Sequence, residues 1–252
     1  MKRKKIILDN IIFVLAPIVF IIIWQFACNY QWVNTRILPS PKEVFDALRD
    51  LLATNKFQQH LIASVRRVAL GFAFGATAGV LMGFLTGISR TIDDFVGAAF
   101  SVLRSIPTIG LMPLLILFYG IGEESKLVVI GLGTFWSVLL NTQQGISSTD
   151  IKLLEVGKML EKNKLTVILK IVLPAALPSM FTGMRLGLSN AWKSVVAAEM
   201  IASVRGIGYM ISYAREMFQT DVMFVGLFTL GIIGLALDIL LLQLQKKLVF
   251  WE

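Results

Sequence analysis

Ionisable and polar side chains recur at helical spacing inside an apolar stretch near residue 190. One face of an α-helix would carry Arg185, Ser189, Trp192, Val196 and Glu199. Arg185 and Glu199 would lie about 21 Å apart along such a helix, too far to pair with each other. Each charge therefore needs a partner on another helix, or water. Ionisable groups inside an apolar span usually face a cavity or a bundle interior and are typical of ion and solute paths.

Two interpretations of this polar face stay open. It either lines a solute path or forms structural ion pairs with neighbouring helices. Arg104 and Asn141, in other apolar stretches, are candidate companions of the face, and Asp238 near the end of the last stretch is a candidate partner for Arg185. We favour the solute path, and we include Arg104 and Asn141 in it as a hypothesis.

Residues suited to nucleophilic or metal-assisted catalysis are scarce. The single cysteine, Cys28, excludes an intramolecular disulfide, and the single histidine, His60, cannot build a metal site alone. A membrane-embedded hydrolase would need a nucleophile with a base, and His60 lies outside the expected spans. The sequence also lacks the G-x-x-x-x-G-K-[ST] loop that holds ATP phosphates. We therefore expect no catalytic residue, no metal and no cofactor on this chain.

The elements that must position the polar residues are membrane helices. The 252 residues are 56% hydrophobic and 16% charged, with a mean hydropathy of +0.75, whereas soluble proteins are about 25% charged. The apolar residues gather in runs of roughly 20, and backbone groups in lipid must bond within their own segment. The sequence predicts one all-α membrane domain over 1–252, with six spans at 11–29, 66–88, 97–119, 127–146, 180–202 and 222–244.

The basic start and the number of spans predict the topology. No small-residue cleavage site follows MKRKK, so we interpret the first run as a retained helix that starts in the cytoplasm. Six crossings return the C-terminus and the segment 147–179 to the cytoplasmic side, and the distribution of basic residues agrees weakly. The net charge of +8 is explained by residues that flank membrane helices, without nucleic acid.

A row of glycines marks the second expected span. It comprises Gly71, Gly75, Gly79, Gly83 and Gly87, one at every fourth position. On a helix this row forms a smooth groove that another helix backbone can approach closely. The spacing predicts a role in helix packing.

The segment 147–179 is a charged island between two apolar spans. Asp150 and Asn163 are candidate N-caps of two short amphipathic helices, and Pro174 is expected to end the second. In the first helix, Leu153, Gly157 and Leu160 are expected to share an apolar face. Helices of this kind either lie on the membrane surface or dock into a partner protein.

The island resembles the EAA loop of ABC importer permeases, which carries a Glu-Ala-Ala start, a glycine six residues after the Glu and a final Ile-x-Leu-Pro. Here Glu155 begins the pattern, and Ile171, Leu173 and Pro174 end it. The stretches LPSPKEV at 38–44, LRSIPTIGLMPL at 103–114, FYGIGEESK at 118–126, LPAALPSMFTGMRLGLSNAW at 173–192, VAAEM at 196–200 and GIGYMI at 206–211 resemble the nitrate, sulfonate and taurine importer group, in order.

Two positions of the loop depart from the family pattern. Gly157 stands where the pattern has its second alanine, and Glu161 stands where it has the glycine. If Glu161 keeps the left-handed turn of that glycine, the turn is strained by about 1 kcal/mol. If the turn is remodelled, Glu161 instead continues the first helix and pairs with Lys164 or a partner. The residues expected to couple to a partner are Glu155, Gly157, Leu160, Glu161, Asn163, Ile171, Leu173 and Pro174.

The resemblance implies a type I importer fold in the bacterial plasma or inner membrane, with both termini cytoplasmic. It implies a second permease copy or paralogue, two ATPase subunits that bind ATP and Mg²⁺, and an extracytoplasmic solute-binding protein. The solute is expected to be a small anion such as nitrate, a sulfonate or taurine, or a vitamin precursor. An ion-coupled secondary transporter is the alternative, although no internal repeat is found and only Glu199 and Asp238 are expected as buried acids.

Overall fold

The computed structural model describes residues 2–248, and the side chains from Leu15 onward except that of Pro17. Over this range the chain forms helices and no strands. The α-helices, with one 3-10 segment (η1) and one π segment (η2), are α1 (Lys2–Asn29), α2 (Pro41–Ala53), α3 (Lys56–Ile88), α4 (Arg90–Arg104), η1 (Thr108–Leu111), α5 (Met112–Tyr119), α6 (Glu123–Ser147), α7 (Ile151–Met159), α8 (Lys164–Val167), η2 (Ile168–Val172), α9 (Leu173–Ala202), α10 (Ile207–Glu216) and α11 (Thr220–Leu248).

Four helices of the described range are long and apolar enough to cross a membrane: α3, α6, α11 and the stretch Lys164–Ala202 that contains α9. They contain the spans predicted at 66–88, 127–146, 180–202 and 222–244. The span predicted at 11–29 lies within α1, and its side chains before Leu15 fall outside the described ones.

The prediction of one continuous span over 97–119 is wrong. The structure breaks this stretch into α4 and α5, which meet at an angle of 86°. Pro107 explains the break, because it has no N–H to donate and its ring disfavours helical geometry at the residue before it. Hydropathy alone does not register such a bend, so the apolar run looked continuous.

The expectation that Pro174 ends a short helix is also wrong. The chain continues from α8 through η2 into α9, and Pro174 lies in the first turn of α9. The Leu173 N–H donates to the carbonyl of Ile168, five residues earlier, as in a π-turn. We infer that this wider turn accommodates the missing donor of Pro174 without stopping the helix.

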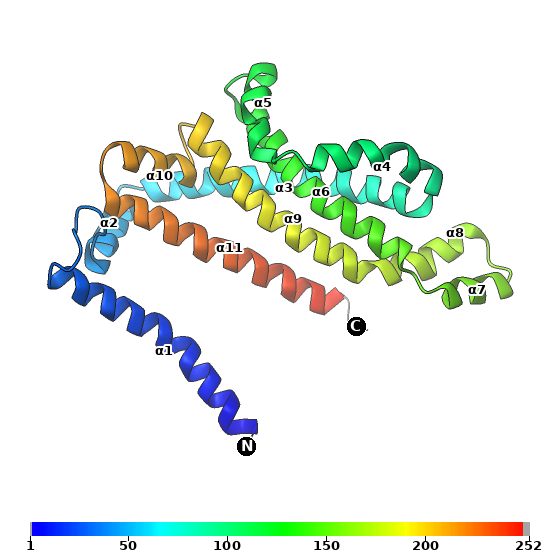
Figure 1. Cartoon of the computed structure of the whole chain (residues 1–252), viewed down its shortest axis with the longest axis horizontal. Coiled ribbons are helices and arrows are strands. Elements are labelled where there is room, and N and C mark those ends of the chain that lie inside the picture. Colours follow the sequence, from blue (N-terminus) through cyan, green and yellow to red (C-terminus); the bar gives the residue numbers. More distant parts are fainter. Residues whose placement is uncertain (1, 249–252) are drawn as a thin grey trace.

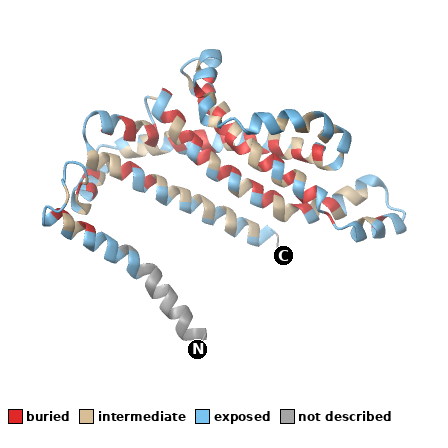
Figure 2. Cartoon of the chain, in the orientation of Figure 1, coloured by how far each residue is buried: buried red, intermediate tan, exposed pale blue. Residues whose placement is uncertain are grey.

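Helices α3, α6 and α9 form the centre of the bundle, and Figure 2 shows buried residues along them. The glycine row of α3 lies directly against α6, so the two backbones approach closely. A Cβ added at Gly75 would collide with the carbonyl of Gly131, and one at Gly79 would lie 2.9 Å from the carbonyl oxygen of Phe135.

The two ends of the bundle differ in structure. At one end, α10 and α2 both pack on α11, around Val44, Ile207 and Val225 (Figure 1). At the other end, α7 and α8 project beyond α6 and α9. We refer to these as the α10 end and the α7 end.

Candidate functional site

The 150–174 loop at the α7 end begins its two helices with the predicted caps. The Asp150 carboxylate accepts the N–H of Lys152 at 2.9 Å, and the Asn163 side-chain oxygen accepts the N–H of Thr166 at 2.8 Å. Both cap predictions are confirmed. Each cap satisfies an N–H group at the start of a helix that the helix itself leaves unpaired.

Glu161 lies in a left-handed turn, with φ at 52°. Helix α7 ends at Met159, the N–H of Glu161 donates to Lys158 O at 3.0 Å, and the N–H of Lys162 donates to Gly157 O at 3.1 Å. These two bonds make a Schellman motif, in which glycine usually takes the left-handed position. The alternative in which Glu161 continues the first helix is therefore wrong.

Gly157 is the position at which α7 lies against the chain that returns through α8 and η2 toward α9. A Cβ at Gly157 would lie 3.1 Å from Val167 and 3.2 Å from Ile171. The face of α7 that packs against the protein runs through Gly157 and the half-buried Leu154. Leu153 and Leu160, which we expected to share an apolar face with Gly157, are 47% and 61% exposed, and Leu160 is the C-cap of α7, so only Gly157 of these three residues is buried.

The outward surface of the 150–174 loop is apolar. Its exposed large hydrophobic residues are Ile151, Leu153, Val156, Met159, Leu160, Leu165 and Leu169. Met159, at the end of α7, is 84% exposed, and Glu155 is exposed beside these side chains. Exposed apolar side chains gathered in this way are typical of a surface that a protein partner or the membrane covers.

The residues of the polar face of α9 lie at two separate sites in the structure. Arg185, Ser189 and Trp192 line a cavity of about 220 Å³ between α9 and α11. Arg185 donates three hydrogen bonds of 3.0–3.1 Å to the Asp238 carboxylate, which confirms the predicted pair. The Trp192 indole N–H donates to the carbonyl of Leu230 at 3.0 Å. This cavity combines a charge pair, a hydroxyl and apolar walls.

Glu199 does not reach that cavity. Its side chain is buried at the α10 end, near the last turn of α9, where other charged residues surround it. Arg104 lines a separate cavity of about 430 Å³ between α4 and α6, together with Asp93 and Trp136. The structure therefore does not bring Arg104 or Glu199 to the α9–α11 cavity.

Asn141 is not part of either cavity. Its amide donates to the carbonyl of Ser137 on its own helix at 2.8 Å, and its Cβ lies against Gly183 of α9.

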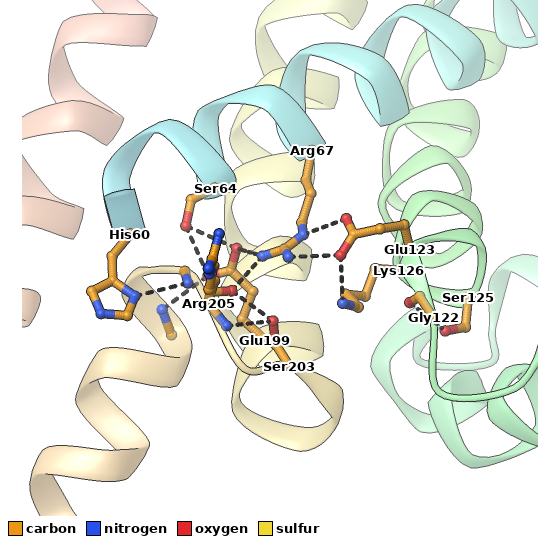
Figure 3. Close-up of polar contacts among 12 residues, drawn as sticks. His60, Ser64, Arg67, Gly122, Glu123, Ser125, Lys126, Glu199, Ser203 and Arg205 are labelled. Atoms are coloured by element: carbon orange, nitrogen blue, oxygen red, sulfur yellow. Dashed lines mark hydrogen bonds and ion pairs between the residues drawn. The ribbon is translucent and has the colours of Figure 1, made fainter. Parts of the chain in front are cut away.

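The residues around Glu199 form what we call the Arg67 cluster: His60, Ser64, Arg67, Glu123, Lys126 and Glu199 (Figure 3). The Arg67 guanidinium donates to Glu199 at 2.7 Å and, through two nitrogens, to Glu123 at 2.7 Å each. Lys126 pairs with Glu123 at 2.8 Å. Arg67 is not among the candidate site residues predicted from the sequence. The spacing of His60, Ser64 and Arg67, which places them on one face of a helix, was the sequence feature that could have indicated this cluster.

In the described part of the chain, no group of three or more His, Cys, Asp or Glu side chains is placed so that it could hold a metal ion. Within the cluster, the Nδ1 of His60 accepts the N–H of Gly206 at 3.1 Å. His60 thus acts as a hydrogen-bond acceptor for the backbone. The cluster is a network of charge-assisted hydrogen bonds between helices.

The bundle, with its broken span and two helices projecting at one end, is similar to a chain of a solved ABC transporter. The MetNI methionine ABC transporter, solved in inward-facing conformations, contains a chain that matches 73% of this chain and 92% of its own length, with a TM-score of 0.64 and 18% identity. Residues 75–250 match the model of the binding-protein-dependent transport system inner membrane component. This chain belongs to that family.

Sequence relatives cover nearly the whole chain. SsuC of Bacillus subtilis, assigned as an aliphatic sulfonates transport permease, is 37% identical over 94% of this chain and 86% of its own length. The taurine transport system permease protein TauC of Escherichia coli is 31% identical over 93% of this chain and 87% of its own length. These relatives agree with the importer group that the sequence motifs resemble.

Proposed function

We propose that this permease couples to separate ATPase subunits through the 150–174 loop. The observation that carries the proposal is the apolar outward surface of that loop, around Val156 and Met159, with Glu155 at its side. Exposed apolar patches mark protein–protein or membrane interaction sites, and here the proposed occupant is a protein partner. In this proposal the partner subunits hold ATP and Mg²⁺. This chain supplies the 150–174 loop that docks on those subunits, and it also supplies the solute path.

The proposed assembly contains two permeases, as a homodimer or with a paralogue, and two ATPase subunits. Two ATP sites need two coupling loops, and each chain supplies one. The α7 end then faces the cytoplasm, together with both termini, and the α10 end faces outward. An extracytoplasmic solute-binding protein delivers the solute to the α10 end.

The proposed solute is a small organic anion of the sulfonate class. SsuC and TauC support this proposal by their sulfonate and taurine assignments. Arg185, Ser189 and Trp192 are the proposed path residues, because they line a cavity with polar and apolar walls. Arg104 and Asp93, in the cavity between α4 and α6, form a second polar surface that a path can use.

Reconstitution into proteoliposomes tests the proposal. The permease, the ATPase and the solute-binding protein are combined, and uptake of radiolabelled alkanesulfonate and taurine is measured with and without internal ATP. We expect uptake that needs ATP and the binding protein together. Uptake that follows an imposed proton or sodium gradient without ATP would instead support an ion-coupled transporter.

A further inference from the structure

The charged residues inside the apolar stretches 180–202 and 222–244 are Arg185, Lys193, Glu199 and Asp238. Arg185 pairs with Asp238. Glu199 pairs with Arg67. Lys193 is the exception, because it is exposed on α9 and forms no ion pair within the described residues. A charge without a counter-ion is costly in an apolar span, so the counter-ion of Lys193 must come from outside this chain.

Lys193 lies too deep in α9 to reach the membrane surface. Helix α9 runs from Leu173 to Ala202, so Lys193 is about 14 Å along the axis from its end and about 30 Å from its start. Lysines near a helix end extend their ammonium groups to the lipid headgroups, and this position is near neither end. A lipid phosphate is therefore a poor counter-ion for Lys193.

Lys193 lines the cavity of about 220 Å³ between α9 and α11, together with Ser189 and the pair of Arg185 and Asp238. Ser189 and Lys193 are four residues apart, so they are neighbours on one face of the helix. The wall formed by α11 is open, because a Cβ added at Gly231 would have no atom within 4 Å. The cavity thus holds free space bordered by a cation and a hydroxyl group.

The charged groups that line this cavity leave one positive charge without a partner. Arg185 and Asp238 cancel each other, and Lys193 remains. Most of the other lining residues are apolar, and they include Leu188 and Leu230. Ligand sites combine apolar walls with a few placed polar groups. A small organic ion with a single negative charge and a short alkyl chain matches this lining.

We propose that Lys193 binds the anionic head of the solute and selects alkanesulfonates over zwitterionic sulfonates such as taurine. The inference rests on the proposed function, because it takes the cavity between α9 and α11 as part of the solute path. The sulfonate of an alkanesulfonate neutralises Lys193 and accepts a hydrogen bond from Ser189, while its alkyl chain lies against the apolar walls. Taurine also carries an ammonium group, and Asp238 is already held by Arg185, so this second cation stays unpaired in the cavity.

Equilibrium binding to the permease tests this inference. The complex of permease and ATPase is placed in lipid nanodiscs without the binding protein, and the dissociation constants of butanesulfonate, taurine and the neutral butyl methyl sulfone are measured. We expect the wild type to bind taurine about tenfold more weakly than butanesulfonate. Lys193→Met should weaken butanesulfonate binding about 10–100-fold and leave sulfone binding unchanged, because only a charge is lost.

Two further variants separate the charge of Lys193 from its structural effects. Lys193→Arg keeps the charge and should bind butanesulfonate within about threefold of wild type. Arg66→Met is the matched control and should leave butanesulfonate binding unchanged. Arg66 is also an exposed cation of a membrane helix without an ion pair in the described residues, but it does not line the cavity.

Several results would overturn the role of Lys193. They are equal butanesulfonate binding by wild type and Lys193→Met, no saturable binding by wild type, and an equal loss of sulfone binding, which would indicate a changed cavity shape. Taurine binding as tight as butanesulfonate binding would overturn the selectivity. If Lys193 instead pairs with an acid of a second permease, native mass spectrometry of Lys193→Met should show the permease pair dissociating, which would also overturn the inference. ATP-driven uptake by the wild type is measured on the same preparation, and its absence would overturn the proposed function itself.

Discussion

Replacement of Glu161 by glycine should stabilise the permease, whereas replacement by alanine should not. Glu161 has φ at 52° in the turn after α7, and its side chain forms no ion pair within the described residues. A residue with a Cβ costs about 1–2 kcal/mol in left-handed geometry. Glycine removes this strain but loses part of the gain to the greater freedom of the unfolded chain.

The net expectation for Glu161→Gly is a gain of about 0.5–1 kcal/mol, which corresponds to a rise of roughly 1–4 °C in the unfolding temperature of a chain of this size. Glu161→Ala retains the Cβ and should unfold within about 1 °C of wild type. Thermal unfolding of the purified complex, with uptake measured on the same preparations, provides the assay. Greater stability of the alanine variant than of the glycine variant would refute the left-handed turn.

Three further predictions concern helix packing, the two ion pairs and the stoichiometry of the complex. Gly75→Val should prevent α3 from packing on α6 and reduce the folded yield sharply, whereas Gly231→Ala, with nothing within 4 Å of the added Cβ, should leave the yield unchanged. Glu199→Gln should lower the free energy of unfolding by about 3–5 kcal/mol, because it leaves the buried Arg67 guanidinium partly unpaired. Asp238→Asn changes a half-exposed pair and should lower it by less than about 1 kcal/mol. Thermal unfolding measures both changes. Native mass spectrometry should detect two permeases for every two ATPases, and one permease for every two ATPases would contradict the proposed pair.

Features that depend on local spacing were predictable from the sequence. The caps Asp150 and Asn163 and the glycine row need only the helical period and the chemistry of the side chains. The pair of Arg185 and Asp238 was also predictable, since each is a lone charge in an apolar span and requires a partner.

Features that depend on tertiary arrangement were not predictable in the same way. Arg67 and Glu199 are separated by 132 residues along the chain, and Arg67 precedes the apolar core of its span. Neither hydropathy nor spacing therefore indicates that these two residues form an ion pair. The bend at Pro107 and the continuous path through Pro174 show that a proline alone does not decide whether a helix breaks. The neighbouring hydrogen bonds decide it, and these form only in the folded bundle.

Charge reversal at Glu155 tests the central claim, that the 150–174 loop joins this permease to its ATPase. The ATPase that co-purifies with the permease is quantified, and ATP hydrolysis and solute uptake are measured on the same complex. Glu155→Lys is predicted to lose the ATPase, or to hydrolyse ATP without uptake, while the control Glu216→Lys, an exposed reversal on α10, keeps both. Normal co-purification and normal uptake for Glu155→Lys would contradict the account.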